Sequence, residues 1–491
     1  MLKPALEEVQ GLAKSYNKIP VYLEMYMDYH TPITVLSLLK EEYERYFLLE
    51  SMEGGERIAR YTFIGAHPKE SFEIKDGVAY FSTREKLKRF DGNPMDALSK
   101  VMAQYKAPKY DGFVPFTGGA VGYFGYDIIR YSEELPKPQR DDLKASDVKL
   151  MMFDEVIAFD HFKQKMYIIS NITVDEEIDI EEEYENAKNR IKYLKEIISR
   201  PVKRRKVEVP ENVEFKSTIT KEKFMQNVEK AKEYIANGDI FQVVPSQTFT
   251  AKMENSLFDV YRVLRTINPS PYMYLMQFDD LELAGASPEL LVKTENHKIT
   301  TMPIAGSRPR GKDEESDSAM EKDLLSDPKE LAEHNMLVDL GRNDIGKVSD
   351  IDTVQVTEYM KVQRYSHIMH ITSTVQGQLK EELNGVDALR SILPAGTLSG
   401  APKVRAMEII QELEEDKRGI YGGAIGYIGY EGTLDTCIAI RTLVKKDGIA
   451  YVRSGVGVVL DSNPEKEYEE SVNKAMALME AVRKVGEIVW Y

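Results

Sequence analysis

Two ten-residue segments that lie far apart in the chain nearly repeat one another. Residues 118–127 read GGAVGYFGYD and residues 422–431 read GGAIGYIGYE, so seven of ten positions are identical. Glycine inside an apolar, β-prone run usually marks a place where another strand or a ligand approaches the backbone closely. Both explanations stay open from the sequence. Neither segment is a G-x-G-x-x-G turn that leads into a helix, so neither predicts a dinucleotide site.

The remaining patterns mix helices and strands without a regular βαβ rhythm. Residues 220–238 predict a helix, with Thr220 as a suitable N-cap and Gly238 at the end. The apolar face of this helix comprises Phe224, Val228, Ala231 and Ile235. The short β-prone run 240–244 then predicts a strand. We therefore expect an α+β fold with large antiparallel sheets flanked by helices.

One stretch divides the chain into two parts. Residues 175–200 are highly charged with helical periodicity, and the polar, proline-bounded stretch 200–210 follows them. We predict an N-terminal part, residues 1–200, and a second part, residues 213–491, packed together.

Composition excludes several classes of function. The net charge of −16 argues against nucleic acid as a partner, and an anionic substrate would need local cations and backbone N–H groups. No run approaches the roughly 20 apolar residues that span a bilayer, and the first residues lack the apolar core of a signal peptide. A single cysteine, Cys437, excludes an internal disulfide. We expect a cytoplasmic protein with no membrane partner.

Two pairs of glutamates have the spacing of a metal site. Glu330 and Glu333 stand three residues apart at the start of a predicted helix, and Glu467 and Glu470 repeat the pattern. Residues at i and i+3 share one face of a helix, so each helix can direct two carboxylates to one point. Oxygen ligands without cysteine suit a hard cation, Mg²⁺ before Ca²⁺.

The alternative is that these glutamates only solvate a helix surface. The chain has 81 acidic residues, and the same spacing recurs at Glu182 and Glu185, on a helix that we expect to face solvent. The spacing alone therefore does not decide between the two explanations.

Three glycine-containing segments predict ligand-binding loops. They are residues 303–311, 395–403 and 454–459. In the first two, glycine beside a hydroxyl residue offers N–H and O–H donors to an anion, and the second leads into a helix N-terminus that favours a carboxylate. Arg441, in the apolar run 437–442, needs an anionic partner if it is buried. For each segment an ordinary turn or a structural ion pair is the alternative.

Three side chains are candidates for acid–base work. His367 and His370 stand three apart but lack the pattern of a zinc peptidase, and a satisfied core histidine is the more common outcome. Glu289 precedes apolar residues, and partial burial would raise its pKa and suit it to a general-acid role. A solvent-facing glutamate at a helix start is the alternative. The residues alone thus predict a Mg²⁺-dependent enzyme that acts on a small carboxylate.

Together, several long segments resemble those of the chorismate-utilising enzymes, and among them the large subunits of anthranilate synthases. The match covers nearly the whole chain and is strongest at residues 327–344, 303–311, 395–403 and 454–470.

The resemblance implies that the chain converts chorismate and ammonia to anthranilate and pyruvate. It implies that Glu333 and Glu470 hold Mg²⁺, with Glu330 and Glu467 beside the ion. Glu289 matches the general acid for loss of the 4-hydroxyl, and His370 matches the histidine of the elimination step. Positions that match the family's substrate contacts are Gly306, Ser307, Thr397, Tyr421, Arg441, Gly455, Val456 and Gly457. At 307 the pattern more often has threonine, and serine keeps the hydroxyl.

Two positions separate this chain from related activities. Isochorismate and salicylate synthases carry lysine where this chain has Gln242, and aminodeoxychorismate synthases typically carry lysine where it has Ala305. Both differences favour the anthranilate reaction. Aminodeoxychorismate synthesis and a non-catalytic tryptophan-binding protein remain the alternatives.

Two further segments resemble the family's tryptophan-binding pocket, so the resemblance implies feedback inhibition by tryptophan. They supply Glu50 and Ser51 from one part of the chain, and Pro271, Tyr272 and Met273 from the other. The N-terminal part must then fold against the second part.

The resemblance also implies a partner. Cys437 lacks the glycine-rich setting of an amidotransferase nucleophile. We therefore expect a separate glutamine amidotransferase subunit and a hetero-oligomer.

Overall fold

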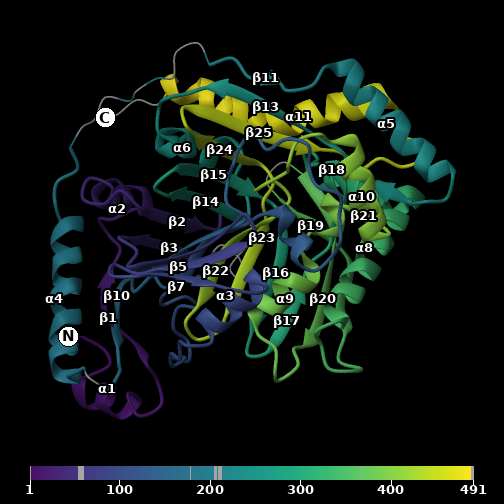
Figure 1. Cartoon of the computed structure of the whole chain (residues 1–491). Helices are drawn as coiled ribbons and strands as arrows, with labels where there is room; N and C mark the ends of the chain where they lie inside the picture. The colour runs from purple at the N-terminus through teal and green to yellow at the C-terminus, as the bar shows by residue number, and fades with distance from the viewer. Residues whose placement is uncertain are drawn as a thin grey trace.

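Two large antiparallel sheets pack face to face, with helices over both outer faces (Figure 1). The computed structural model describes residues 2–52, 60–176, 178–203, 207, 209, 213–365 and 368–487. Within these residues no helix is both long and apolar enough to cross a bilayer. The predicted α+β fold with large antiparallel sheets is confirmed.

Strands from both parts of the chain enter both sheets. Sheet A has eleven strands in the order β1 (Lys18–Tyr26), β10 (Lys165–Thr173), β9 (Glu155–Asp160), β3 (Tyr61–Ala66), β2 (Tyr46–Glu50), β14 (Tyr272–Gln277), β15 (Leu281–Ser287), β24 (Thr442–Lys446), β25 (Ile449–Gly455), β13 (Ser246–Lys252) and β11 (Lys216–Ser217). Sheet B follows the order β18 (Ile304–Pro309), β20 (Ile368–Gln378), β17 (Lys298–Thr301), β16 (Leu290–Glu295), β23 (Leu434–Ile438), β22 (Ala424–Gly429), β7 (Gly119–Phe124), β8 (Val148–Phe153), β4 (Glu70–Lys75), β5 (Val78–Ser82) and β6 (Leu87–Phe90), with β19 (Gln355–Arg364) paired to β20.

Helices and short elements complete the chain. The helices are α1 (Leu6–Leu12), α2 (Pro32–Leu39), α3 (Pro94–Met102), α4 (Ile180–Ile198), α5 (Lys221–Ala236), α6 (Leu257–Ile267), α7 (Glu314–Ser326), α8 (Pro328–Gly346), α9 (Gly385–Ile392), α10 (Lys403–Leu413) and α11 (Pro464–Arg483). The 3₁₀ turns are η1 (Tyr126–Tyr131), η2 (Gly396–Leu398) and η3 (Lys484–Glu487), and β12 (Gln242–Val243) pairs with β21 (Gly400–Ala401).

The same order of elements occurs twice. In sheet A the series β1-β10-β9-β3-β2 is mirrored by β13-β25-β24-β15-β14, and the two series meet where β2 pairs with β14. In sheet B, β7-β8-β4-β5-β6 is matched by β22-β23-β16-β17-β20, and they meet where β7 pairs with β22. The helices also correspond: α1, α2, α3 and α4 have the same places among the strands of the first half as α5, α6, α9 and α11, in that order, have in the second. The molecule is therefore a pseudo-two-fold arrangement of two halves.

The glycine repeat of the sequence lies on this pseudo-two-fold axis. Strands β7 and β22 carry the two copies and pair with each other, with Gly122 opposite Gly426. A Cβ at Gly122 would lie 2.0 Å from the carbonyl oxygen of Lys149, and one at Gly426 would lie 2.0 Å from that of Asp435. Close approach of strands, the first of the two explanations left open, thus accounts for these glycines.

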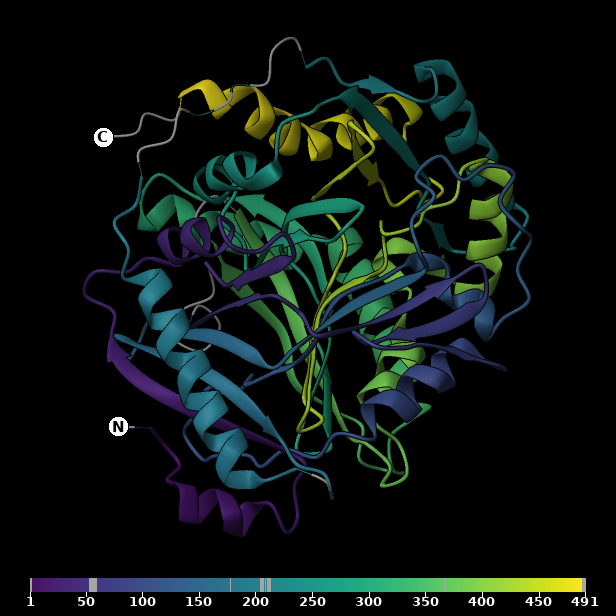
Figure 2. The same ribbon diagram turned by 60° about the vertical axis from the view of Figure 1, so that its left-hand side comes forward.

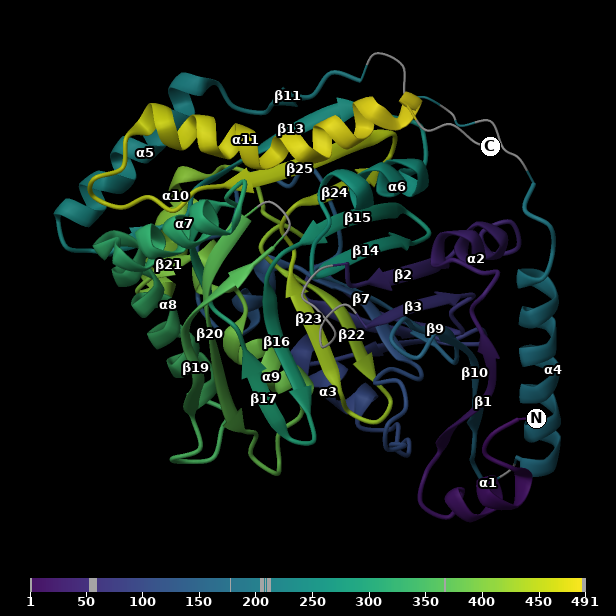
Figure 3. The same cartoon turned by 180° about the vertical axis from the view of Figure 1, so that it is seen from behind.

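Three apolar layers hold the sheets and helices together. One lies between the sheets and includes Phe47, Phe153 and Tyr274. A second joins the outer face of sheet A to helices α2, α4, α6 and α11. The third joins the outer face of sheet B to α3, α8 and α9. Figures 2 and 3 show α4 against the β1 side of sheet A and α11 along β13 and β25.

The second half carries additional elements that the first lacks. Strand β18, helices α7 and α8 and strand β19 lie between β17 and β20, and η2, β21 and α10 lie between α9 and β22. Five of the twelve residues that the sequence predicts for substrate and metal binding lie on these insertions: Gly306, Ser307, Glu330, Glu333 and Thr397.

Several local predictions need comment. Helix α5 has the predicted Thr220 cap and ends just before Gly238, as expected. The run 240–244 was expected to be one strand, but the strand β12 comprises only Gln242–Val243, because its pairing with β21 covers two residues and its bridge to Val458 only one. The apolar run 437–442 is also not one strand: it breaks at Arg441, whose φ of 51° separates β23 from β24.

The boundary between the two predicted parts falls between α4 and β11. Residues 204–206, 208 and 210–212 of that stretch lie outside the described residues. Both parts contribute strands to both sheets, and their division into domains stays a prediction.

Candidate active site

Glu289 is a buried carboxyl between two sheets. It lies in the short link from β15 to β16 and is 9% exposed, so it is not the solvent-facing helix residue that was the alternative. Burial raises the pKa of Glu289 to about 8, while the hydrogen bond from Thr397 and the charge of Lys474 act to lower it. Thr397 Oγ1 donates to its Oε1 at 3.2 Å. At neutral pH this side chain therefore holds a proton that it can give away.

His370 lies on β20, across from Ser307 on β18. Its Nδ1 is 2.8 Å from the carbonyl oxygen of Gly306. Because a carbonyl oxygen only accepts, Nδ1 carries the proton, and Nε2 of the neutral ring is left as an acceptor. Burial and the charge of Arg441 hold the pKa of His370 below its usual value, so the ring is neutral at pH 7. His367 lies outside the described residues.

The segment 303–311 was expected to be a loop, but residues 304–309 form strand β18. A bulge between Ala305 and Ser307 interrupts its pairing with β20, and Gly306 has a φ of 68°. A Cβ at Gly306 would lie 3.0 Å from Glu330 Oε2. The bulge thus presents backbone and the exposed Ser307 hydroxyl beside the first acid pair.

The first acid pair lies in the opening turns of α8, which Asp327 caps. Glu330 contacts Arg308 at 3.4 Å, and Glu333 accepts a hydrogen bond from Gln242 Nε2 at 3.2 Å. Burial and the neighbouring charge of Glu333 raise the pKa of Glu330. The two carboxylates therefore repel one another in a partly buried place.

The second acid pair lies in the opening turns of α11. Glu470 forms an ion pair with Lys474 at 2.6 Å, and Lys474 also donates to the carbonyl oxygen of Gly455 at 3.3 Å. Burial raises the pKa of Glu467, the neighbouring charge of Glu470 adds to this, and Lys329 at the start of α8 acts in the opposite direction. The two helix starts are thus close enough to interact electrostatically.

The two acid pairs have the right chemistry for Mg²⁺: four carboxylates, no sulfur, and like charges that a cation would relieve. Within the described residues no three such side chains are grouped closely enough to hold an ion. Glu333 accepts a hydrogen bond from the Gln242 amide, and Glu470 forms an ion pair with Lys474 instead. The residues therefore fit the ion chemically, and its binding stays a prediction.

Strand β25 and the turn after it form the floor of the site. A Cβ at Gly455 would lie 2.8 Å from the Tyr421 hydroxyl, and one at Gly457 would lie 2.6 Å from Gln242 Nε2. Val456 between them is buried, and its N–H donates to the carbonyl oxygen of Pro245. The two glycines allow neighbouring side chains to approach the backbone that the sequence predicted for ligand contact.

Arg441 is the cation that faces this floor. It is half-buried, and the described contacts of its guanidinium include a hydrogen bond from Nη1 to the carbonyl oxygen of Lys474 at 3.0 Å. Burial lowers its pKa, and Tyr421 and Glu470 act in the opposite direction. A depression of 330 Å³ is lined by Arg441, Lys466, Glu469, Glu470, Asn473 and Lys474.

Several predicted site residues contact one another or a common neighbour. Direct contacts link Glu289 to Thr397, His370 to Gly306, and Arg441 to Lys474. Sequence reasoning missed Lys474, which contacts Glu470 and influences Glu289. The Glu470–Lys474 spacing of four residues was a signal that could have identified it.

A second cavity of 570 Å³ lies between the sheets where the two halves meet. Its lining includes Glu50, Ser51, Pro271, Tyr272 and Met273, the residues predicted to bind tryptophan. Strand β2 pairs with β14 so that Glu50 faces Met273 in register. Segments far apart in the sequence are thus brought side by side.

The polar side chains of this cavity differ in whether they have hydrogen-bond partners within the protein. Glu50 accepts a hydrogen bond from the Tyr261 hydroxyl at 2.7 Å and forms an ion pair with Arg265 at 2.8 Å. The Oγ of Ser51 is buried and, among the described residues, has no hydrogen-bond partner. Ser51 is therefore the better candidate to donate to a bound molecule.

Cys437 also lines this cavity and is not placed for nucleophilic chemistry. It is buried, its thiol donates to the carbonyl oxygen of Ile425, and burial raises its pKa. A thiol that stays protonated is inert.

Comparisons with known proteins identify the family. Residues 44–480 match the family model of chorismate binding enzymes, and this chain belongs to that family. The anthranilate synthase component 1 of Acetivibrio thermocellus is 50% identical over 496 residues, covering 99% of this chain and 100% of that protein. The protein of the same name from Aquifex aeolicus is 45% identical and covers 98% of each chain.

Solved structures agree. The crystal structure of anthranilate synthase component I from Streptococcus pneumoniae superposes with a TM-score of 0.78 at 40% identity, covering 87% of this chain and 95% of that one. The menaquinone-specific isochorismate synthase of Escherichia coli has a TM-score of 0.71 at 16% identity, covering 98% and 99%, and shares the fold.

Proposed function

We propose that this chain is the synthase component of an anthranilate synthase, which converts chorismate and ammonia to anthranilate, pyruvate and water. Near-full-length relatives of that name support the proposal. The structural observation that carries it is a buried proton donor, Glu289, in the same site as a neutral amide, Gln242.

The site first has to hold a dianion. Arg441 and Lys474 supply positive charge against the net charge of the chain, and Lys474 donates to the carbonyl oxygen of Gly455. Ser307 on β18 adds a hydroxyl donor, and the Thr397 hydroxyl, whose proton goes to Glu289, can accept. When Mg²⁺ is bound by Glu333 and Glu470, with Glu330 and Glu467 beside it, it would bind the ring carboxylate and offset its charge.

Glu289 serves the first step. As ammonia adds to C2 of the ring, the 4-hydroxyl leaves, and Glu289 gives it the proton that makes it water. Gln242 cannot accept a proton from water, since an amide is not a base at neutral pH. Ammonia already has a free electron pair and needs no such base. The side-chain chemistry therefore favours an amine over water as the nucleophile.

His370 serves the second step. The ring loses the proton at C2 and the enolpyruvyl group, which departs as pyruvate, and the product becomes aromatic. The neutral imidazole, with Nδ1 fixed on the carbonyl oxygen of Gly306, presents Nε2 for proton transfer.

Two partners complete the proposal. Because Cys437 is an inert buried thiol, the nitrogen comes from a separate glutamine amidotransferase subunit. The working assembly is therefore a hetero-oligomer. Tryptophan binds in the cavity between the sheets and inhibits the reaction.

The test is a fluorescence assay of the purified chain with chorismate, Mg²⁺ and ammonium. We expect anthranilate emission that requires Mg²⁺, declines with tryptophan and is absent when glutamine replaces ammonium. Consumption of chorismate without anthranilate would indicate the aminodeoxychorismate or isochorismate reaction. No turnover despite tryptophan binding would indicate a regulatory protein.

A further inference from the structure

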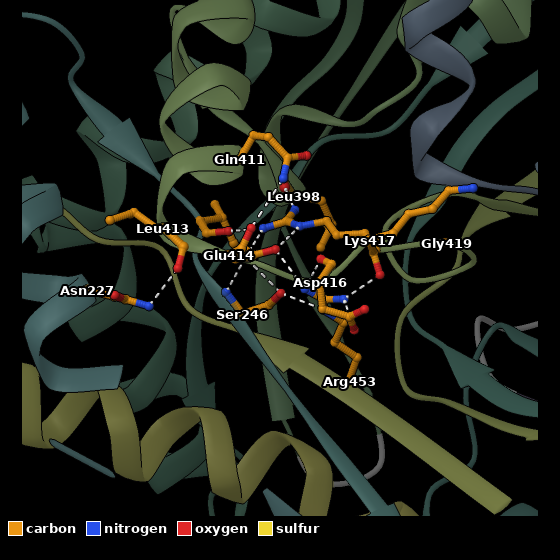
Figure 4. A network of polar contacts seen from close by, with 12 residues as sticks. Asn227, Ser246, Leu398, Gln411, Leu413, Glu414, Asp416, Lys417, Gly419 and Arg453 are labelled. Carbon is orange, nitrogen blue, oxygen red and sulfur yellow. Dashed lines mark hydrogen bonds and ion pairs between the residues drawn. The ribbon is translucent and has the colours of Figure 1, made fainter. Parts of the chain in front are cut away.

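A buried guanidinium lies directly behind the proposed active site. Arg418, in the segment that connects α10 to β22, has a side chain that is 2% exposed. Its Nε and Nη2 donate to the two carboxylate oxygens of Glu414 at 2.8 and 2.6 Å. Its remaining hydrogen bonds go to two backbone carbonyl oxygens, those of Leu398 and Val244, each at 2.6 Å. Figure 4 shows the contacts around Glu414.

The two carbonyl groups belong to two different loops of the site. Leu398 follows Thr397, whose hydroxyl donates to Glu289. Val244 follows β12, where Gln242 donates to Glu333. The two loops also pair through the backbone, because β12 pairs with β21 and the Val244 N–H donates to the carbonyl oxygen of Ser399 at 3.1 Å. The planar cation adds a buried side-chain anchor between the loop that contacts the proton donor and the loop that contacts the acid pair.

The charge of Arg418 is fully compensated inside the protein. Glu414 also accepts hydrogen bonds from the N–H and hydroxyl of Ser246, at 2.6 and 2.9 Å, and from Arg453 Nη2 at 2.8 Å. Burial opposes the charge of Glu414, but the two arginines outweigh it and the pKa of Glu414 lies below its usual value. The pair is thus a fixed ionic group rather than a titrating one.

A buried ion pair contributes little net stability, because desolvation offsets most of its attraction. Apolar side chains of the same volume could fill this place equally well. They could not hold two carbonyl groups at a set separation and direction. The rigid fork of a guanidinium can do so, whereas the single ammonium of a lysine has a flexible stem and one point of attachment.

We propose that Arg418 is a positioning residue of the reaction: it fixes the Thr397 loop relative to β12, and so sets Glu289 relative to Glu333 across the substrate. This inference rests on the proposed function.

The first test is Arg418→Lys, which keeps the charge and loses the fork. We expect kcat to fall by about 100-fold, the scale of a roughly 1 Å displacement in an active site. KM for chorismate should change by a much smaller factor. The alkaline limb of kcat/KM should also move to higher pH, because a displaced Thr397 no longer lowers the pKa of Glu289.

The matched control is Arg453→Lys. Arg453 shares the carboxylate of Glu414 and its side chain is 8% exposed, against 2% for Arg418. Its backbone acceptors are the carbonyl groups of Asp416 and Lys417, and its Nε donates to the Ser246 hydroxyl at 2.8 Å, so it bonds to neither the Leu398 nor the Val244 carbonyl group. We expect a similar loss of thermal stability, with kcat and the alkaline limb close to those of the unsubstituted chain.

A readout that does not depend on turnover is amide hydrogen exchange. In Arg418→Lys, exchange should accelerate in residues 242–244 and 396–400, and in Arg453→Lys it should not. If Arg418→Lys does not fold, Glu414→Gln weakens the same anchor and should show the same exchange pattern with a smaller loss of kcat.

The proposal is overturned if Arg418→Lys keeps kcat and the alkaline limb, or if Arg453→Lys loses as much. If the unsubstituted chain does not turn over chorismate, the proposed function fails, and the catalytic role of Arg418 fails with it. Hydrogen exchange in Arg418→Lys and Arg453→Lys then still tests the structural part of the proposal: faster exchange of the two loops in Arg418→Lys alone would show that the guanidinium fixes them.

Discussion

Glu289 differs from the other acidic side chains of the site through its surroundings alone. It lies between apolar strands with one hydroxyl neighbour, whereas the acid pairs lie at helix starts among Arg308, Lys474 and Gln242. Environments that separate the pKa values of carboxyl groups assign them different roles. Here one carboxyl keeps its proton at pH 7, and the paired ones are free to bind a cation.

The pH dependence of the reaction should report this proton. With burial raising the pKa of Glu289 to about 8, the free enzyme loses its acid above that pH. We expect kcat/KM to decline with an alkaline midpoint near 8, and Glu289→Gln to reduce kcat by about 10²- to 10⁴-fold. A pH profile measured with saturating ammonia at each pH checks this. An unchanged alkaline limb in a still-active Glu289→Gln variant would contradict it.

The same group should limit stability in alkaline solution. The pKa of Glu289 is higher in the folded chain than in the unfolded one, so the folded state retains a proton that the unfolded state releases. Stability is therefore lost as pH rises from about 4.5 to about 8. We expect Glu289→Gln to have a higher free energy of unfolding than the unsubstituted chain at pH 9, by up to about 5 kcal/mol, and therefore a higher melting temperature, with little difference at pH 4.5.

Thermal melts at the two pH values measure this, with Glu182→Gln on an exposed position of α4 as the control. A stabilisation that is equal at both pH values would show that ionisation of Glu289 is not its cause.

At the scale of elements, α4 and α11 form a natural comparison. Each closes one half of the molecule, and each carries two glutamates three residues apart, Glu182 and Glu185 on α4, Glu467 and Glu470 on α11. The pair on α4 is exposed, and among the described residues the ion pair of Glu185 is with its helical neighbour Lys188. In the part of the chain that the structure describes, only the second half contains the insertion with α8, whose first turns carry the other acid pair.

Mg²⁺ should therefore distinguish the two helices. At about 100 times its dissociation constant the ion should stabilise the folded chain by about 2.7 kcal/mol. We expect Glu470→Gln and Glu333→Gln to abolish this increase in melting temperature, and Glu182→Gln to keep it. Melts with and without Mg²⁺ at constant ionic strength check this without any assay of turnover. An equal increase in all four proteins would place the ion elsewhere.

Local signals predicted some of these elements well. The Thr220 cap and the Gly238 end define α5 because capping involves only adjacent residues. The bounds of β12, β18 and β23 were mispredicted because each depends on a partner far along the chain. Likewise, the spacing of Glu330 and Glu333 is visible in the sequence. The burial of Glu289 and the bonds of Arg418 to Leu398 and Val244 are not, since they arise only when distant loops meet.

At the scale of the whole molecule, the pseudo-two-fold arrangement explains how a regulator could act at a distance. Strands β2 and β14 are the central pair of sheet A, one from each half, and the cavity that contains Ser51 and Met273 opens beside them. The chain continues from β15 directly through Glu289 into β16. A ligand in the cavity therefore contacts both halves and lies one strand away from the proton donor.

Tryptophan and chorismate should accordingly weaken each other's binding by equal factors. If tryptophan weakens chorismate binding through the β2–β14 pair that joins the two halves, chorismate must weaken tryptophan binding to the same extent. Titration of tryptophan by calorimetry, with and without chorismate and in the absence of ammonia, measures one factor, and competition for chorismate measures the other. Tryptophan affinity that does not change with chorismate, in a chain that tryptophan still inhibits, would mean that tryptophan acts on turnover instead.

Ser51→Ala tests whether tryptophan binds in this cavity through a hydrogen bond to Ser51. Since Ser51 Oγ has no described partner in the chain, its removal should cost little stability, while loss of one hydrogen bond to the ligand should weaken tryptophan binding about fivefold. Ser99→Ala is the matched control, because Ser99 Oγ is likewise buried without a described partner but lies on α3, outside the cavity lining. We expect uninhibited kcat to be the same in both variants, and only Ser51→Ala to require more tryptophan for half-inhibition. Equal inhibition of both variants would mean that tryptophan makes no hydrogen bond to Ser51, and the cavity would then bind it through the backbone of residues 271–273 alone.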